Sequence, residues 1–144
     1  MTAAERWIDE HANVVDDDGD TVHAAVTVDL NVDSIVTVRR IHASDERPQG
    51  LALDADQPLV VGDVTKTRMV LWAHSAPDKV EIAAPAGRLT LWNVWEADGA
   101  AHAWVGAAGI LLDEAAGDTT RLRTSDGFGE RTIDLEVEIH IRAA

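Results

Sequence analysis

The chain has 144 residues and no cysteine, and its 26 acidic and 12 basic side chains give a formal net charge of −14 at pH 7. Without cysteine there is no disulfide, thiolate metal site or cysteine nucleophile, and the excess of carboxylates argues against a nucleic-acid partner, because Lys and Arg supply the sequence-independent part of that affinity. The length and a hydrophobic content of 46% predict a single domain, residues 1–144, with a core that needs no covalent staples.

The sequence predicts neither a signal peptide nor a membrane span. The opening residues MTAAERWIDEH contain no basic segment followed by an apolar one. The longest nearly apolar stretch, Val105–Leu112, contains two glycines and is well under the roughly 20 residues that a membrane-spanning helix needs. We therefore expect a soluble, cytoplasmic protein without a membrane partner.

The first helix signal in chain order lies at residues 2–15. Thr2 and Glu5 have the three-residue separation of a capping box. The residues that follow recur with the spacing of one helix face: Trp7, Ile8, His11, Val14 and Val15. We predict one short N-terminal helix here, which the acidic run at residues 16–20 ends.

From residue 21 to about residue 142 the pattern predicts β-strands. Apolar and polar residues alternate at 22–30, and the alternation is cleanest at 132–142, which indicates one buried and one solvated face. The dipeptide Asp98-Gly99 predicts a hairpin that pairs Arg88–Trp95 with Ala101–Val105. Residues 43–58, rich in Asp, Pro and Gly, predict a long loop with at most a short strand.

These elements predict an all-β fold. About eight to ten short strands with tight turns, and no helix available for parallel crossovers, favour an antiparallel barrel or sandwich. The strand number alone does not separate the two architectures. Glycines at positions 106 and 109, where a strand would have to bend, favour the barrel.

No catalytic or cofactor motif is present. The histidines are scattered and lie in no metal-binding motif, and none of the serines lies in G-x-S-x-G. The series Asp16, Asp18, Asp20 resembles the start of a calcium loop, but Thr21 replaces the required Gly and Thr27 replaces the required carboxylate. We therefore expect no metal and no cofactor, and interpret the acidic series as a solvated linker. The alternative is a weak divalent-cation site that shares a carboxylate from outside the series.

The aromatic composition is unusual, with five Trp, one Phe and no Tyr. Trp92 and Trp95 have opposite parity in one predicted strand, so they point to opposite faces and cannot both fill one core layer. Asn93 lies between them, and His74 and His102 lie on neighbouring predicted strands. Aromatic walls with a few convergent polar groups are typical of small-molecule sites. The predicted ligand-binding residues are Trp72, His74, Trp92, Asn93, Trp95, His102 and Trp104. The competing interpretation is that Trp fills the core in place of Phe and Tyr.

Two classes of function agree with these features. The first is a non-catalytic module that binds a small molecule or a protein, which includes a second copy of the chain in a homo-oligomer. The alternative is a metal-free enzyme of the isomerase, cyclase or lyase type. In such an enzyme His74 or His102 would act as general base, oriented by Asp113 or Asp126.

Overall fold

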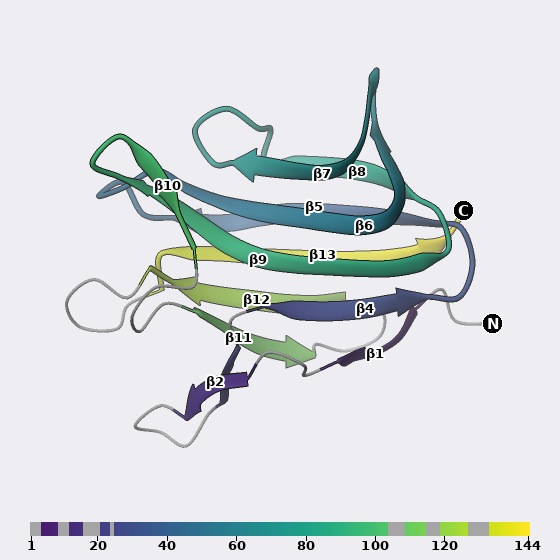
Figure 1. The fold of residues 1–144 in the computed structure, drawn as a ribbon, viewed down its shortest axis with the longest axis horizontal. Coiled ribbons are helices and arrows are strands. Elements are labelled where there is room, and N and C mark those ends of the chain that lie inside the picture. The colour runs from purple at the N-terminus through teal and green to yellow at the C-terminus, as the bar shows by residue number, and fades with distance from the viewer. Residues whose placement is uncertain are drawn as a thin grey trace.

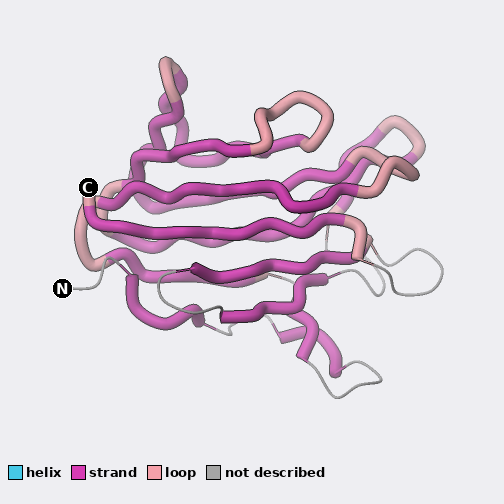
Figure 2. Tube along the Cα trace, turned by 180° about the vertical axis from the view of Figure 1, so that it is seen from behind, coloured by secondary structure: helices cyan, strands magenta, loops and turns pink. Residues whose placement is uncertain are grey.

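The computed structural model describes residues 4–8, 12–15, 21–23, 25–103, 109–114, 119–126 and 133–144. All the regular elements among these residues are strands, and they form one antiparallel sheet of 13 strands that curves into a nearly closed barrel (Figure 1, Figure 2). The predicted all-β class is therefore confirmed, with a barrel-shaped sheet.

The strands are numbered in the order of the chain, but they lie in a different order in the sheet. They are β1 (Ala4–Ile8), β2 (Ala12–Val15), β3 (Thr21–His23), β4 (Val26–Leu30), β5 (Ser34–Ala43), β6 (Gln49–Val61), β7 (Val64–Trp72), β8 (Lys79–Ala84), β9 (Gly87–Ala97), β10 (Ala100–His102), β11 (Gly109–Glu114), β12 (Thr119–Ser125) and β13 (Leu135–Ala143). Their order in the sheet is β1-β4-β9-β6-β8-β5-β13-β12-β11-β3-β2, with β10 beside β9 and β7 beside β6. Most neighbours are thus distant in the sequence.

The helix predicted at residues 2–15 is wrong for the described part of that segment. Ala4–Ile8 pairs with β4 and Ala12–Val15 pairs with β3, so both form strands. An isolated helix of this length is marginal, whereas a strand satisfies its backbone groups on the edge of a sheet. The aromatic and β-branched residues of the segment also favour strands. Thr2 and His11 lie outside the described residues.

The inward face of β13 carries the alternation that the sequence predicted. Leu135, Val137, Ile139 and Ile141 are each at most 5% exposed, whereas the residues between them are half-buried or exposed. β13 lies between β5 and β12 in the sheet, and its apolar face packs into the core. Burial of that face is the main stabilising contribution that a strand in this position can make.

The hairpin predicted at Asp98-Gly99 is confirmed. Asp98 has φ 54° and Gly99 has φ 77°, as a type I′ turn requires. The turn places His102 opposite Trp95 in the β9–β10 pair. Residues 104–108, which the sequence assigned to the end of this hairpin and to the bend at Gly106, lie outside the described residues.

The long loop predicted at 43–58 is wrong from Gln49 onward, because β6 starts there and pairs with both β7 and β9. Leu51 and Leu53 face the core and are at most 1% exposed. Most of the polar residues that suggested a loop lie on the opposite face of β6 or at a point where its pairing with β7 is irregular. Pro58 lies in that irregularity, between Asp54 and Leu59, where the register with β7 shifts, and proline is commonly found at such irregularities.

The outer face of β6 is closely packed over Gly50. A Cβ atom at this position would lie 2.9 Å from Trp72 Cε3 and 3.1 Å from methyl groups of Val70 and Val94. These three side chains come from β7 and β9, on either side of β6. Glycine is therefore required here by the close approach of the neighbouring side chains.

We expect Gly50→Ala to lower the free energy of unfolding by about 1–3 kcal/mol, because an added methyl group overpacks this contact. Urea denaturation of the two proteins measures the difference. The combined variant Gly50→Ala/Trp72→Leu serves as the control, since removal of the indole vacates the space. If the alanine costs the same in the Trp72→Leu background, the indole contact is not its cause.

Candidate functional site

A cavity of about 540 Å³ lies at the end of the barrel where β5 leads into β6 and β7 leads into β8. Its lining residues come from two segments, 40–49 and 73–78. Sites for small organic molecules typically have volumes of about 300–1,000 Å³. The cavity therefore has the size of a small-molecule site.

Backbone hydrogen bonds hold both segments against the strands. In the first segment, the Ser44 N–H donates to Asp134 O over 2.6 Å. In the second, the Ala73 N–H donates to Gln49 O over 2.8 Å. Because each segment is tied to a neighbouring part of the sheet, the walls of the cavity are already in place without a ligand.

Arg40, near the end of β5, is held at the cavity wall by the β7–β8 loop. Its backbone N–H donates to Asp78 O over 2.7 Å, its Nη1 donates to Ala76 O over 3.2 Å, and its Nη2 makes a short ion pair with the Asp78 carboxylate. A guanidinium has five N–H donors. Arg40 therefore retains donors that make no hydrogen bond within the described part of the chain, and these can bind a carbonyl or carboxylate oxygen.

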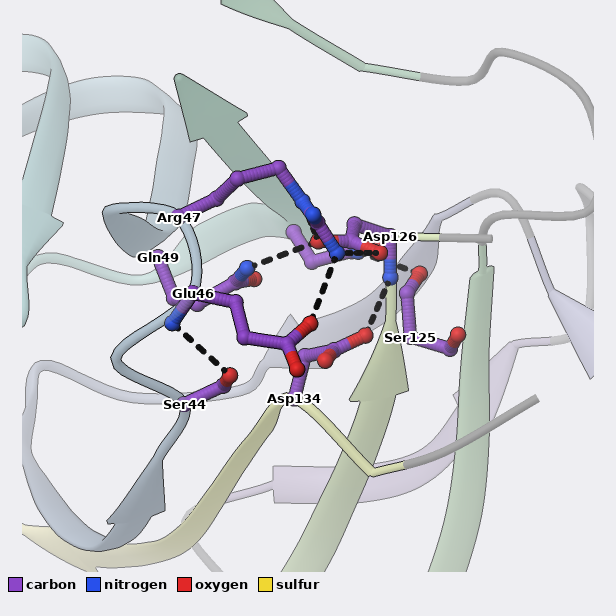
Figure 3. A network of polar contacts seen from close by, with 8 residues as sticks. Ser44, Glu46, Arg47, Gln49, Ser125, Asp126 and Asp134 are labelled. Carbon is purple, nitrogen blue, oxygen red and sulfur yellow. Dashed lines mark hydrogen bonds and ion pairs between the residues drawn. The ribbon is translucent and has the colours of Figure 1, made fainter. Parts of the chain in front are cut away.

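Arg47, in the β5–β6 loop, binds a buried carboxylate (Figure 3). Its Nε and Nη2 donate to the two carboxylate oxygens of Asp126 over 2.6 and 3.1 Å. Gln49 Nε2 donates to Asp126 Oδ2 over 3.0 Å, and the Asp126 N–H donates to Asp134 Oδ2 over 2.9 Å. The Asp126 side chain is 0% exposed, whereas that of Arg47 is 22% exposed and lines the cavity. The network therefore connects the cavity wall to a fully buried charge.

The surrounding carboxylates keep Arg47 charged. The hydrogen bond to Asp126 raises the pKa of Arg47 above its ordinary value; partial burial opposes this effect, and the negative charges of Asp126, Asp134 and Glu46 add to it. A group whose pKa is raised stays protonated at all pH values below that ordinary value. Arg47 is therefore a permanent cation at the edge of the cavity.

The side-chain oxygen of Gln49 has no partner among the described residues. Gln49 is 1% exposed and lines the cavity, and its Nε2 is committed to Asp126, which sets the orientation of the amide. Its Oε1 accepts no hydrogen bond from any residue that the structure describes. A buried polar atom without a hydrogen bond destabilises the folded protein by about 1–3 kcal/mol. Most buried polar groups in native proteins therefore make at least one hydrogen bond. A donor from a bound molecule would remove this cost.

Among the seven predicted ligand-binding residues, His74 lines the cavity. Trp72, the last residue of β7, lies beside it with ring centroids 5.8 Å apart. The sequence placed the two residues on one face of a strand. In the structure β7 ends at Trp72, so the β7–β8 loop presents the imidazole of His74.

Three further predicted residues lie together on β9 and β10 and are not among those that line the cavity. Asn93 is 2% exposed and its Nδ2 donates to Ser125 O over 3.0 Å. The Trp95 ring, 2% exposed, stacks on His102 with centroids 6.3 Å apart, and its Nε1 has no hydrogen-bond partner in the described ranges. His102 Nε2 lies 3.1 Å from Ala97 O. These contacts agree with structural roles.

Trp92 lies on the opposite face of β9 from Trp95, because side chains alternate along a strand and β9 pairs with β6 without a register shift. Trp92 is 8% exposed, and the guanidinium carbon of Arg68 lies 5.6 Å from the centroid of its ring. This distance is that of a cation–π contact. Trp104 lies outside the described residues.

No family model, curated protein or solved structure matches this chain. The site is therefore interpreted from its own chemistry. Within the described part of the chain, no group of three or more His, Asp or Glu side chains is placed to hold a metal ion. No helix in the same residues is long and apolar enough to cross a membrane.

Sequence reasoning did not single out Arg40, Arg47 or Gln49, and it considered Asp126 only as a partner for a histidine. Arg47 and Gln49 lie in the segment predicted to be a loop. Asp126 is separated from Arg47 by 79 positions in the sequence. No local pattern connects residues so far apart, and the pairing follows from the sheet order alone.

Proposed function

We propose that this protein binds a small polar molecule in the cavity at the end of the barrel, without converting it chemically. The observation that carries the proposal is that Gln49, a residue of the wall of a cavity of about 540 Å³, has a buried Oε1 that accepts no hydrogen bond from the described part of the chain. Ligand sites combine such a volume with a few fixed polar groups. The hydrogen bonds of the two wall segments supply the rigidity that a site of this kind needs.

The polar groups of the wall indicate the chemistry of the ligand. Gln49 Oε1 requires a hydroxyl or N–H group from the ligand. Arg40 offers N–H donors that suit a carbonyl or, with greater strength, a carboxylate. His42 and His74 also line the cavity and can donate or accept. The class that fits these groups is a small hydroxy acid or amino acid.

The enzyme alternative has one supporting observation, which is that His42 and His74 line the same cavity. A general base needs a fixed orientation, and none of the four histidine side chains that the structure describes, at 42, 74, 102 and 140, hydrogen-bonds a carboxylate. Asp126, one of the two carboxylates expected to orient a histidine, binds Arg47 and Gln49 instead. The other, Asp113, lies on β11. Binding without catalysis is therefore the better supported function.

We expect a ligand-observed NMR screen of small hydroxy acids and amino acids to give hits whose affinity depends on the cavity wall. His74→Ala and Arg40→Gln should each weaken a hit about tenfold, which is the loss of one charge-assisted or neutral hydrogen bond. Calorimetric titration measures the change. Lys66→Ala, an exposed cation on β7 away from the cavity, is the matched control and should leave the affinity unchanged.

Hits that lose no affinity in either wall variant would contradict binding at this cavity. Turnover of a hit, followed by the same NMR spectra over time and abolished by His74→Ala, would replace the binding proposal with the enzyme alternative. The two readouts come from one set of samples.

A further inference from the structure

The outer face of β8, β5, β13 and β12 concentrates cations in a chain that is otherwise strongly acidic. Strand pairing places the side chains of this face in rows across the sheet. One row contains Arg121, Glu138, Arg39 and Lys79, taken from β12, β13, β5 and β8 in turn. Three of its four members are cations, although carboxylates outnumber cations 26 to 12 in the chain.

Arg39 and Lys79 are directly opposite each other on neighbouring strands. Like charges in this arrangement destabilise a sheet, because the two side chains lie about 5 Å apart at their Cβ atoms. Arg39 approaches Glu138 only at 3.9 Å and its side chain is 60% exposed, while Lys79 makes no ion pair within the described residues. Glu138 is bound more closely by Arg121, over 2.6 Å. Within the described residues, the carboxylate that pairs with Arg39 is therefore shared with Arg121, and the repulsion between Arg39 and Lys79 is only partly relieved.

A depression of about 390 Å³ lies over this pair and extends along the two central strands. Arg142, which makes no ion pair in the described part of the chain, lines it together with His140 from the same face of β13. The hydroxyl-bearing residues Thr37 and Thr119 lie on either side of His140 in the sheet. The depression therefore brings together hydrogen-bond donors from cationic and from neutral side chains.

Two carboxylates also line the depression, and they do not cancel its cations. Glu138 is engaged by Arg121 at the side of the row. Glu81 lies opposite Thr37, on β8. Among the residues that line the depression, the three cations Arg39, Lys79 and Arg142 stand against these two carboxylates. The local charge is positive, in contrast to the formal net charge of −14 of the whole chain.

We infer that this depression binds the phosphate group of a small molecule. A tetrahedral oxyanion accepts hydrogen bonds from several directions at once, which suits two or three cations and two hydroxyls arranged around a hollow. A planar carboxylate is matched instead by one bidentate Arg, and Lys binds phosphate as a point charge. A phosphate dianion between Arg39 and Lys79 would convert their repulsion into attraction. The depression shares no residue with the cavity at the end of the barrel, so the two sites are independent.

Titration of the ¹⁵N-labelled protein with inorganic phosphate tests the inference, with NaCl added to the reference sample at matched ionic strength. We expect saturable chemical-shift changes at Arg39, Lys79 and His140. The double variant Lys79→Gln/Arg142→Gln should weaken the apparent affinity at least tenfold. Lys66→Gln, which removes one exposed cation elsewhere, is the control and should weaken it less than twofold.

Both variants change exposed side chains, and their spectra report directly whether they are folded. Lys79→Arg/Arg142→Lys, which retains the charges, should keep the affinity within about threefold and provides a second test. Shift changes that do not saturate, that NaCl reproduces, or that persist unchanged in the double Gln variant would overturn the proposal.

Discussion

Replacement of Arg47 by methionine is expected to lower the free energy of unfolding by about 3–5 kcal/mol, because it leaves the buried carboxylate of Asp126 without its cation. The Asp126 side chain is 0% exposed, so its charge is poorly solvated once the guanidinium is removed. For a protein of this size the thermal midpoint should fall by about 10 °C or more. Urea and thermal unfolding, followed by circular dichroism, measure the effect.

Two control variants separate this effect from a general sensitivity to the loss of arginine. Arg88→Met removes an ion pair with Asp29 in which both side chains are more than 40% exposed, and such pairs contribute about 1 kcal/mol or less. In the Arg47→Met background, Asp126→Asn removes the unpaired charge and should restore part of the lost stability. A loss below about 1 kcal/mol for Arg47→Met alone would show that Asp126 is not a buried charge.

The second large effect is expected at Ile139, which is 0% exposed on β13 and lies opposite Val38 of β5. Ile139→Ala should lower the free energy of unfolding by about 2–5 kcal/mol. This loss is the sum of the transfer free energy of the removed methyl and methylene groups and the free-energy cost of the cavity left behind. His140→Ala, one residue further along the same strand and exposed, should change the stability by less than about 0.5 kcal/mol. Urea denaturation in NaCl buffer compares the two.

This pair of variants tests the register of the strand as well as its burial. Because side chains alternate between faces, a shift of one residue would place His140 in the core and Ile139 in solvent. Equal effects of the two substitutions, or a larger effect at His140, would contradict the strand pairing described for β13.

The strands with a regular alternation were predictable because their two faces meet different environments. The residues at 135–142 alternate because one face of β13 packs in the core and the other carries charged side chains of the outer surface. The turn at Asp98-Gly99 was equally predictable, because its positive φ angles restrict the residue types that can form it. In both cases the physical cause acts within a few residues of the pattern that reveals it.

Two segments were misinterpreted where the local pattern and the tertiary contacts disagreed. The spacing of apolar residues at 2–15 favours a helix, but the described residues of that segment form strands on the edges of the sheet. β6 contains Asp54, Asp56 and Pro58, which are residue types common in loops. Their presence outweighed the signal of the core-facing leucines in the sequence pattern. Local propensities are weak compared with pairing and burial on both sides of a strand.

The amino-acid sequence by itself determined the absence of cysteine chemistry, the formal net charge of −14, the all-β class and the buried face of the clearest strand. Only the tertiary structure decided which residues meet. Arg47, Gln49 and Asp126 form one network because β6 and the end of β12 come together at the same end of the barrel. The opposed cations Arg39 and Lys79 likewise depend on the pairing of β5 with β8. Both sites are assembled from strands far apart in the sequence, and the physical reason is that the order and register of a sheet follow from the burial of all its faces together.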